Sequence, residues 1–176
     1  ISIPREEAVA QPTLTLAQKR IRRLRRSLAA AGLNEAISWA FIREEDAKAF
    51  GGGAPALHLA NPISQDMSVM RPSALPGLLR AVKRNLDRGL TPVRLFEIGA
   101  CFEDDTPKGQ FQVAAMILAG HHGEAHWSSK AKAFDVYDAK YEAERALRAV
   151  GAPVEKLMIT TDAPAWFHPG RSGVLR

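Results

Sequence analysis

The stretch Asn61–Glu103 decides the fold, and it reads NPISQDMSVMRPSALPGLLRAVKRNLDRGLTPVRLFEIGACFE. Its centre predicts an amphipathic helix, because apolar side chains recur at spacings of three and four residues and so form one stripe. The stripe consists of Leu75, Leu78, Leu79, Val82 and Leu86. Ser73 is placed to cap the start of this helix, and Gly89 supplies the signal that ends it.

The second half of the stretch predicts a strand, and the residues after it predict a hairpin. Val93–Glu103 alternates, with Val93, Leu95 and Glu97 on one face and Arg94, Phe96 and Ile98 on the other. Asp104–Gly109 has the composition of a turn, and Phe111–Gly120 is an apolar run that fits a buried strand. We therefore expect two antiparallel strands with the helix packed against them.

The rest of the chain mixes helices and strands without βαβ regularity. Thr15 and Gln18 fit a capping box at the start of a first long helix. Helices are predicted at Leu16–Ala31, Glu44–Phe50 and Ala139–Val150, and extended segments at Glu35–Ile42, Leu57–Ala60, Phe134–Tyr137, Val154–Thr161 and after the turn at Pro169–Gly170. This mixture favours an α+β fold with an antiparallel β-sheet flanked by helices.

Length and composition predict one globular domain. The chain has 176 residues, of which 46% are apolar and 24% charged, and this length suffices for a hydrophobic core. Residues 1–14 hold two prolines and no hydrophobic period, so we expect a linker or the end of a preceding domain there, with the core domain over residues 15–176. Because the chain begins at Ile1 and stops at Arg176 inside an apparent strand, we expect it to be part of a longer protein.

Cysteine usage and hydropathy exclude several classes of protein. The single cysteine, Cys101, excludes an internal disulfide framework and a cysteine cluster for a metal. No apolar run reaches the length that spans a membrane, and no signal peptide is visible. We expect a reducing, cytoplasmic setting.

The positive charge is clustered on the first predicted helix and along the stretch Asn61–Glu103. The formal net charge is +5 and the sequence pI is about 9.7, which favours a polyanion as a partner. One cluster contains Lys19, Arg20, Arg22, Arg23, Arg25 and Arg26, and the other contains Arg71, Arg80, Lys83, Arg84, Arg88 and Arg94. Each cluster is interpreted either as a solvated helix face or as a surface for RNA or an acidic partner.

A search for catalytic constellations finds no self-sufficient active site. His121, His122 and His126 suggest a metal site, but no carboxylate or thiol spacing completes it, and a polar loop is the alternative. Cys101 is expected to be a small buried residue. Residues 51–53 form a glycine run without the Lys-Ser/Thr of a P-loop, and residues 168–171 either grip a phosphate or form a plain turn.

Several segments, in order, resemble one known family. NPISQDMSVMRPSALPGLLRAVKRNL and RLFEIGACFE closely resemble the β chain of bacterial phenylalanyl-tRNA synthetase. The resemblance begins upstream with LTLAQKRIRRLRRSLAAAGLNEAISWAF and continues through Ala125–Trp127, Phe134–Asp138 and Phe167–Ser172. It covers residues 15–176, and an ordered series of this kind is far more specific than one short motif.

The resemblance implies a subunit of a heterotetramer of two α and two β chains, which joins phenylalanine to tRNA-Phe with ATP and Mg²⁺. In that family the α chain is catalytic, and the matched region resembles a catalytic-like module that keeps the class II aminoacyl-tRNA synthetase fold without catalysis. Leu16–Ala31 and the following strand resemble motif 1, which builds the α/β interface. Arg94–Gly99 resembles motif 2 without the full set of ATP-binding arginines, and motif 3 has no counterpart. We expect no catalytic residue, metal or cofactor here.

Two surfaces follow as predictions. The subunit interface is predicted at Val69, Met70, Leu75, Leu78, Leu79, Val82 and Leu86, unless this stripe faces the domain's own sheet. Contacts to the tRNA backbone are predicted at Arg22, Arg23, Arg26, Lys83, Arg84 and Arg88. The rival functions are a stand-alone basic RNA-binding module and a metal-dependent hydrolase centred on the three histidines.

Overall fold

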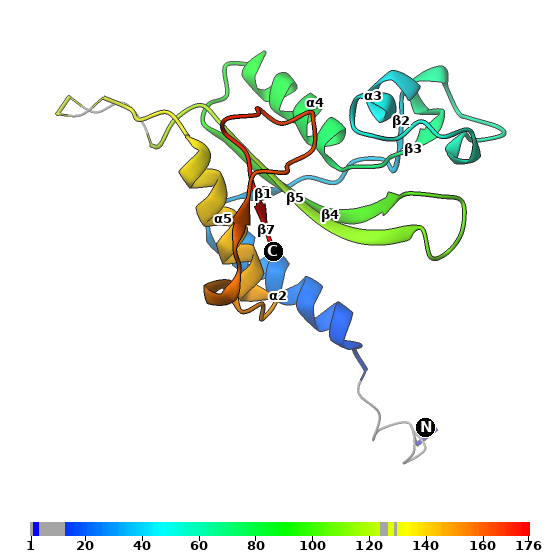
Figure 1. Ribbon diagram of the computed structural model, residues 1–176, viewed down its shortest axis with the longest axis horizontal. Coiled ribbons are helices and arrows are strands. Elements are labelled where there is room, and N and C mark those ends of the chain that lie inside the picture. Colours follow the sequence, from blue (N-terminus) through cyan, green and yellow to red (C-terminus); the bar gives the residue numbers. More distant parts are fainter. Residues whose placement is uncertain (1, 4–12, 124–126, 129) are drawn as a thin grey trace.

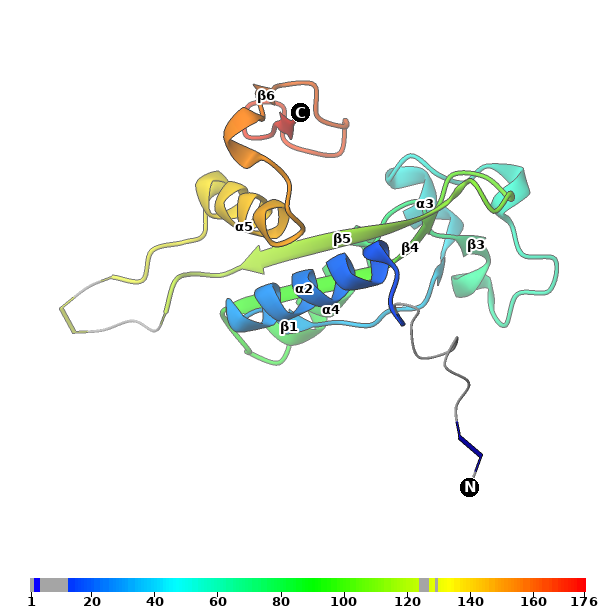
Figure 2. The ribbon, with the colours of Figure 1, turned by 90° about the horizontal axis from the view of Figure 1, so that it is seen from below.

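The computed structural model describes residues 2–3, 13–123, 127–128 and 130–176. A sheet of three strands lies in the middle, in the order β1-β4-β5. Helices α2 (Leu16–Ala30) and α5 (Val136–Ala149) cover one face of this sheet, and α4 (Leu75–Leu86) covers the other (Figures 1 and 2). The predicted linker over residues 1–14 falls mostly outside the described residues, so it stays a prediction.

The central hairpin is the predicted one. Strand β4 (Val93–Phe102) pairs antiparallel with β5 (Gln110–Ala119) along its whole length, from Val93↔Ala119 to Phe102↔Gln110. The short strand β1 (Asn34–Glu35) pairs parallel with β4. Residues alternate along β4 as predicted, so its two faces pack against different helices.

The first face of the sheet forms the main core with α2 and α5. The predicted capping box of α2 is confirmed, since Thr15 and Gln18 bond each other's backbone amides. Leu24 and Leu28 of α2 pack on Phe96 of β4 and on α5. The buried members of this cluster are Leu24, Leu28, Leu33, Phe96 and Ala146.

On the second face, α4 runs from Leu75 to Leu86. The predicted cap at Ser73 is wrong by one residue, because the N-cap is Ala74, which makes no side-chain cap bond; the Ser73 hydroxyl accepts a hydrogen bond from the Leu75 amide at 3.2 Å. Gly89, at a positive φ of 72°, follows the last turn of the helix as predicted. Leu78 and Val82 are buried. The alternative that this stripe faces the domain's own sheet therefore holds for its buried residues.

A small lobe extends from one end of the hairpin. It contains β2 (Phe41–Ile42), α3 (Glu44–Ala49), two 3₁₀ turns (Pro55–Leu57 and Gln65–Met67) and β3 (Val69–Met70), which pairs antiparallel with β2. Its core consists of Ile42, Ala47, Leu57 and Val69. The pairing of β2 with β3 thus fixes the position of β3, from which the chain runs into α4.

Four predicted extended segments were wrong in part. Glu35–Ile42 divides between two sheets, because β1 pairs with β4 whereas β2 pairs with β3. Leu57–Ala60 forms no continuous strand, because Leu57 ends a 3₁₀ turn, and only His58 makes an antiparallel bridge, with Val69. Phe134–Tyr137 ends in helix, because the Asp135 carboxylate caps α5 one residue before Val136. Val154–Thr161 is a 3₁₀ turn (Val154–Lys156) followed by β6 (Ile159–Thr160), which pairs with β7 (Val174–Leu175).

Candidate subunit interface and the buried network behind it

A buried polar network joins the segment before α4 and the segment after β1 to the sheet. Arg71 and Glu97 are each only 3% exposed, and Arg71 Nη1 lies 2.6 Å from Glu97 Oε1. Ser38 bridges the pair, because its hydroxyl donates to Glu97 Oε2 at 2.6 Å and accepts from Arg71 Nη1 at 3.0 Å. Arg71 Nε also donates to the Ala100 carbonyl at 2.9 Å.

Two glycines make room for this network. A Cβ on Gly77 of α4 would lie 2.3 Å from Ser38 Oγ, and a Cβ on Gly99 of β4 would lie 2.3 Å from Arg71 Nη2. Neither glycine has a positive φ, so each is needed for space and not for backbone conformation. The helix, the strand and the edge segment can approach this closely only because both positions lack a side chain.

The network fixes the relative position of three parts of the chain. A buried charge needs a partner and further hydrogen bonds, and each member of this network has both. Cys101 lies fully buried on the same side of β4, where burial, the largest cause, raises the pKa of its thiol, while the charge of Arg71 acts in the opposite direction. Cys101 is therefore the small buried residue predicted from the sequence.

The predicted interface residues separate into buried and exposed groups. Val69, Leu78 and Val82 are 0%, 0% and 7% exposed, so their side chains belong to this chain's own core. Met70 and Leu75 are half-buried. Leu79 and Leu86 are each 45% exposed, and their spacing of seven residues places them on the same side of α4. Only these last two carry a substantial part of their surface into solvent.

The structure exposes further apolar side chains that the sequence argument missed. Ile37 is 92% exposed and Trp39 is 68% exposed, in the segment that leaves β1 beside Ser38. Leu90, just beyond α4, is 54% exposed. We call Ile37 and Trp39 the edge pair, and Leu79, Leu86 and Leu90 the α4 flank. The alternation of residues 36–40 was the available signal, since Ala36, Ser38 and Ala40 point inward.

The predicted RNA-contacting residues lie on opposite sides of the sheet. Arg22, Arg23 and Arg26 are on α2, whereas Lys83, Arg84 and Arg88 are on α4 or follow it (Figure 1). All six are exposed. Lys83 bonds both carboxylate oxygens of Asp87, at 3.0 and 2.7 Å, so its charge is already paired. The structure does not bring the six together into one surface.

Those candidate metal and phosphate residues that the structure describes form no recognisable site. His121 bonds the Gly123 carbonyl, and His122 lies 2.9 Å from Asp138 on the first turn of α5, whereas His126 lies outside the described residues. Within the described part of the chain, no group of three His, Cys, Asp or Glu side chains is placed to hold a metal ion. At residues 168–171, His168 Nδ1 accepts from the Gly170 amide, which is an ordinary turn contact.

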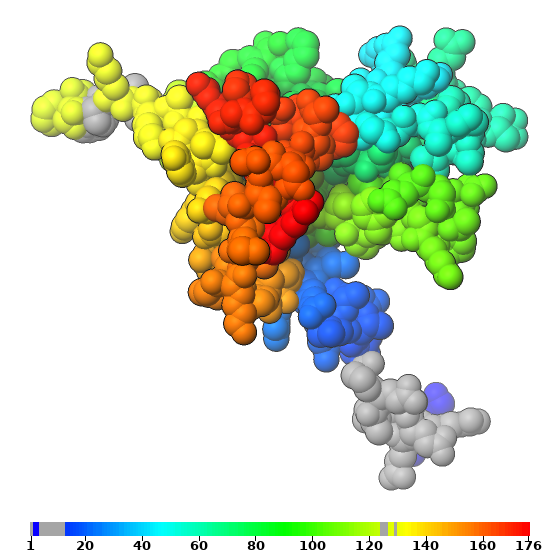
Figure 3. Space-filling view, viewed as in Figure 1, coloured from blue at the N-terminus to red at the C-terminus, as the bar shows by residue number. Residues whose placement is uncertain are grey.

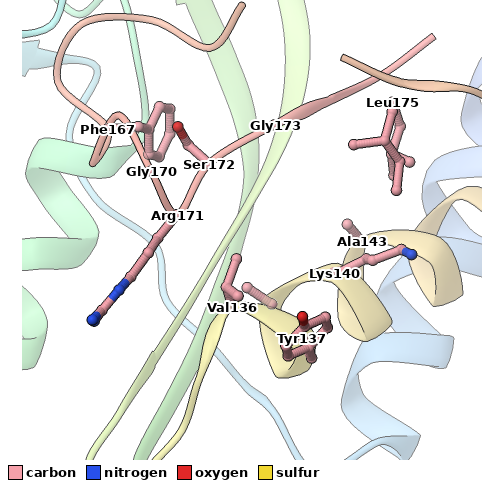
Figure 4. Close-up of a pocket in the computed structure, with 12 residues that line it drawn as sticks. Val136, Tyr137, Lys140, Ala143, Phe167, Gly170, Arg171, Ser172, Gly173 and Leu175 are labelled. Carbon is pink, nitrogen blue, oxygen red and sulfur yellow. The ribbon is translucent and has the colours of Figure 1, made fainter. Parts of the chain in front are cut away.

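A cavity of about 470 Å³ lies between α5 and the last segment of the chain (Figure 4). Its wall is largely apolar, with Val136, Ala143, Phe167 and Leu175 among the lining residues. The side chain of Arg171 extends away from the other labelled residues. Figure 3 shows the last segment lying over the middle of that face of the molecule.

Comparison with known proteins decides the family. Residues 2–176 match the family model described as "Phenylalanyl tRNA synthetase beta chain CLM domain". The chain belongs to this family. It is 48% identical over 169 residues to the phenylalanine–tRNA ligase beta subunit of Paramagnetospirillum magneticum, and 50% identical over 172 residues to that of Bartonella henselae. Each alignment covers 96% of this chain and 21% of the relative, so the chain spans about a fifth of their length.

Solved structures confirm the class II aminoacyl-tRNA synthetase catalytic-like fold. Pyrrolysyl-tRNA synthetase from Desulfitobacterium hafniense superposes with a TM-score of 0.59 at 16% identity, over 86% of this chain and 52% of that one. An ATP phosphoribosyltransferase regulatory subunit/histidyl-tRNA synthetase from Bacillus halodurans gives 0.57 at 14% identity, over 85% and 38%. At these identities the similarity shows the fold alone. No helix within the described residues is long and apolar enough to span a membrane.

Proposed function

We propose that this chain is a non-catalytic module of a phenylalanyl-tRNA synthetase β chain that scaffolds the catalytic α chain. The relatives are named as β subunits of phenylalanine–tRNA ligase, which supports an α chain as partner and tRNA-Phe as the substrate of the assembly. An α2β2 assembly in the cytoplasm completes the proposal. ATP and Mg²⁺ bind to the α chain, and this module contributes position and not chemistry.

The observation that carries the scaffold role is the exposed apolar surface beside the buried network. Ile37 and Trp39 stand 92% and 68% exposed on an edge segment, and Leu79, Leu86 and Leu90 are 45–54% exposed along α4. Exposed apolar side chains grouped on rigid elements are typical of protein–protein interfaces. The edge pair follows α2, the helix that resembles motif 1, and so agrees with the interface that the resemblance implies.

The energetics favour a partner at these positions. Complete burial of one large apolar side chain contributes about 1.5–3 kcal/mol, so burial of the still-exposed parts of these five contributes several kcal/mol that offsets the entropic cost of association. Trp39 has the size and the polar N–H group that interface hot spots favour. The Arg71–Glu97–Ser38 network supports this surface from behind, because Ser38 lies between Ile37 and Trp39 and faces Gly77 of α4, where a Cβ would lie 2.3 Å from the Ser38 hydroxyl.

Co-purification with a separately expressed α chain tests this function. Leu79→Asp places a charge on the exposed α4 flank, and Trp39→Ser removes the larger member of the edge pair. Val82→Asp is the comparison variant for misfolding, because Val82 is one turn away on α4 and only 7% exposed, so a charge there should unfold the chain. We expect the Leu79→Asp and Trp39→Ser variants to fold, as checked by circular dichroism, but to fail to capture the α chain. Full capture by both folded variants would remove this surface from the scaffold role.

A further inference from the structure

The last segment of the chain forms a loop that is closed at its base. Residues 161–173 leave β6 and return in β7, and these two strands pair antiparallel, with Ile159 facing Leu175. Met158 and Arg176 extend the pairing by exchanging both backbone hydrogen bonds, at 2.7 and 2.9 Å. We call residues 161–173 the C-terminal loop. The base of this loop is fixed by the strand pairing, so its far end depends on other contacts.

The far end of the C-terminal loop rests on the small lobe through Trp166. The centroid of the Trp166 ring lies 5.7 Å from that of Phe50, the residue that follows α3. A Cβ on Gly51 would lie only 3.1 Å from Trp166 Cζ3, so the ring approaches the backbone of Gly51 closely. No hydrogen bond or ion pair among the described residues joins the loop to the small lobe. The attachment therefore rests on the packing of an aromatic ring and not on polar contacts.

The residue next to Trp166 forms part of the wall of the apolar cavity beside α5. Phe167 lines that cavity together with Val136 and Ala143 of α5 (Figure 4). The centroids of the Trp166 and Phe167 rings lie 6.2 Å apart, and the Phe167 amide donates to the Pro164 carbonyl at 3.0 Å. Because this turn fixes the two aromatic residues relative to each other, a movement that lifts Trp166 off the small lobe also moves the wall of the cavity.

The hold of the loop on the small lobe is weak compared with the packing of the sheet. Trp166 and Phe167 remain 41% and 43% exposed, so each ring buries only part of its surface. The loop lies on the surface of the molecule (Figure 3). The central hairpin, by contrast, is paired along the whole length of β4 and β5. Segments with few buried apolar contacts open at a lower free energy than core strands, so the loop can detach while the hairpin stays intact.

We propose that the C-terminal loop is a lid, hinged at β6 and β7 and latched on the small lobe by Trp166, which opens without unfolding of the domain. Opening carries Phe167 away from α5 and uncovers the apolar wall at Val136 and Ala143. Gly51 suits the latch, because its φ of 81° favours glycine and a side chain there would crowd the Trp166 ring. The lid involves neither the edge pair nor the α4 flank, so it is independent of the proposed scaffold role.

Trypsin cleavage of the complete β chain, assembled with its α chain, tests the lid. Arg171 lies within the loop, so cleavage after Arg171 reports opening of the lid, whereas cleavage after Arg94, in the middle of β4, reports unfolding of the hairpin. Initial rates at both sites are read by mass spectrometry after brief exposure to the protease. Trp166→Ala removes the latch, and Ile63→Ala is the control, because Ile63 is a 79% exposed apolar residue of the same lobe.

We expect Trp166→Ala to raise the cleavage rate after Arg171 by about 5- to 20-fold, because the ring no longer packs on the small lobe, and to leave the rate after Arg94 unchanged. Ile63→Ala should change neither rate. An unchanged rate after Arg171 in Trp166→Ala would show that Trp166 is no latch. An equal rise after Arg94 would show that Trp166 stabilises the whole domain, which also overturns the lid.

A double variant tests whether Trp166 acts through Phe50. Phe50→Ala alone should raise cleavage after Arg171, but it should add little when Trp166→Ala is already present, because both substitutions remove the same contact. Independent increases that multiply in the double variant would contradict a latch between these two rings.

Fluorescence of the apolar dye anilinonaphthalene sulfonate tests whether the lid covers the cavity. Trp166→Ala should increase binding of the dye to the complete α/β complex, because the wall at Ala143 becomes more accessible. Ala143→Phe in the same background fills the cavity and should remove this increase. The absence of any increase, or an increase that survives Ala143→Phe, would show that the loop does not act as a lid over this cavity.

Discussion

Removal of Arg71 tests whether the buried network holds the domain together. Arg71→Met keeps an unbranched side chain of similar reach but leaves the Glu97 carboxylate, 3% exposed, without its cation. Breaking one partner of a buried ion pair costs about 3–5 kcal/mol, which is a large part of the 5–15 kcal/mol that stabilises a domain. The carbonyl of Ala100 also loses its donor. We therefore expect a free energy of unfolding that falls by at least about 3 kcal/mol.

Urea denaturation followed by circular dichroism measures this loss. With an m-value of about 2 kcal/mol/M, a loss of 3–5 kcal/mol lowers the midpoint by roughly 1.5–2.5 M. Glu97→Leu alone should cost a similar amount, because it leaves the guanidinium unpaired.

The double variant Arg71→Met/Glu97→Leu supplies the decisive comparison. Removing both charges leaves no buried ion, so the double variant should be destabilised by clearly less than the sum of the two single variants. Additive losses, or single losses below about 1 kcal/mol, would refute the argument that the pair is a coupled structural unit.

Four further predictions follow from local features. Gly77→Ala should destabilise the chain by about 1–2 kcal/mol despite the gain in helix propensity. Gly170→Ala is the control and should be close to neutral, because its Cβ would have no neighbour closer than 3.7 Å. A neutral Gly77→Ala in the same urea assay would contradict the close approach of Ser38 to Gly77. Thr15→Ala should cost about 0.5–2 kcal/mol through loss of the α2 capping box, with Thr15→Ser as the conservative control. Cys101 should resist a thiol reagent at pH 8 in the folded chain and react after addition of urea, and rapid labelling of the folded chain would show that the site is open. A hydrogen bond from the Lys132 side chain, the largest cause, lowers the pKa of Asp135. The resulting stabilisation of α5 is present above the ordinary carboxyl pKa of 3.8 and is lost as pH falls through the lower pKa of the folded state. In a titration of helicity against pH, Asp135→Asn should therefore reduce the loss of helix at acid pH.

The elements that the sequence predicts best are those whose signals are local. The stripe of α4, the stop at Gly89 and the alternation of β4 need only neighbouring residues, and each was found within one or two residues of its predicted place. The capping boxes of α2 and α5 show the limit of this approach. The first was recognised from Thr15 and Gln18, but the second, at Asp135 and Asp138, was missed because Asp replaces Glu at the third helical position.

The candidate interface could not be predicted in the same way, because it depends on distant partners. Ser38 contacts Arg71, 33 residues away, and Glu97, 59 residues away. These contacts turn Ser38 inward and leave Ile37 and Trp39 outside, where a continuous strand had been predicted. Periodicity on α4 also cannot separate Leu78 from Leu79, since both belong to the apolar stripe and only the position of the sheet decides which is buried.

Side-chain footprinting of the β chain with and without the α chain tests the central claim most directly. Hydroxyl radicals oxidise exposed Trp, Leu and Ile side chains, so Trp39, 68% exposed, and Leu79 report on the proposed interface, while Ile63 of the small lobe, 79% exposed, serves as the reference. The account predicts that oxidation of Trp39 and Leu79 falls severalfold in the α/β complex while that of Ile63 changes little. Unchanged oxidation of Trp39 and Leu79 in a complex that has demonstrably formed would contradict it.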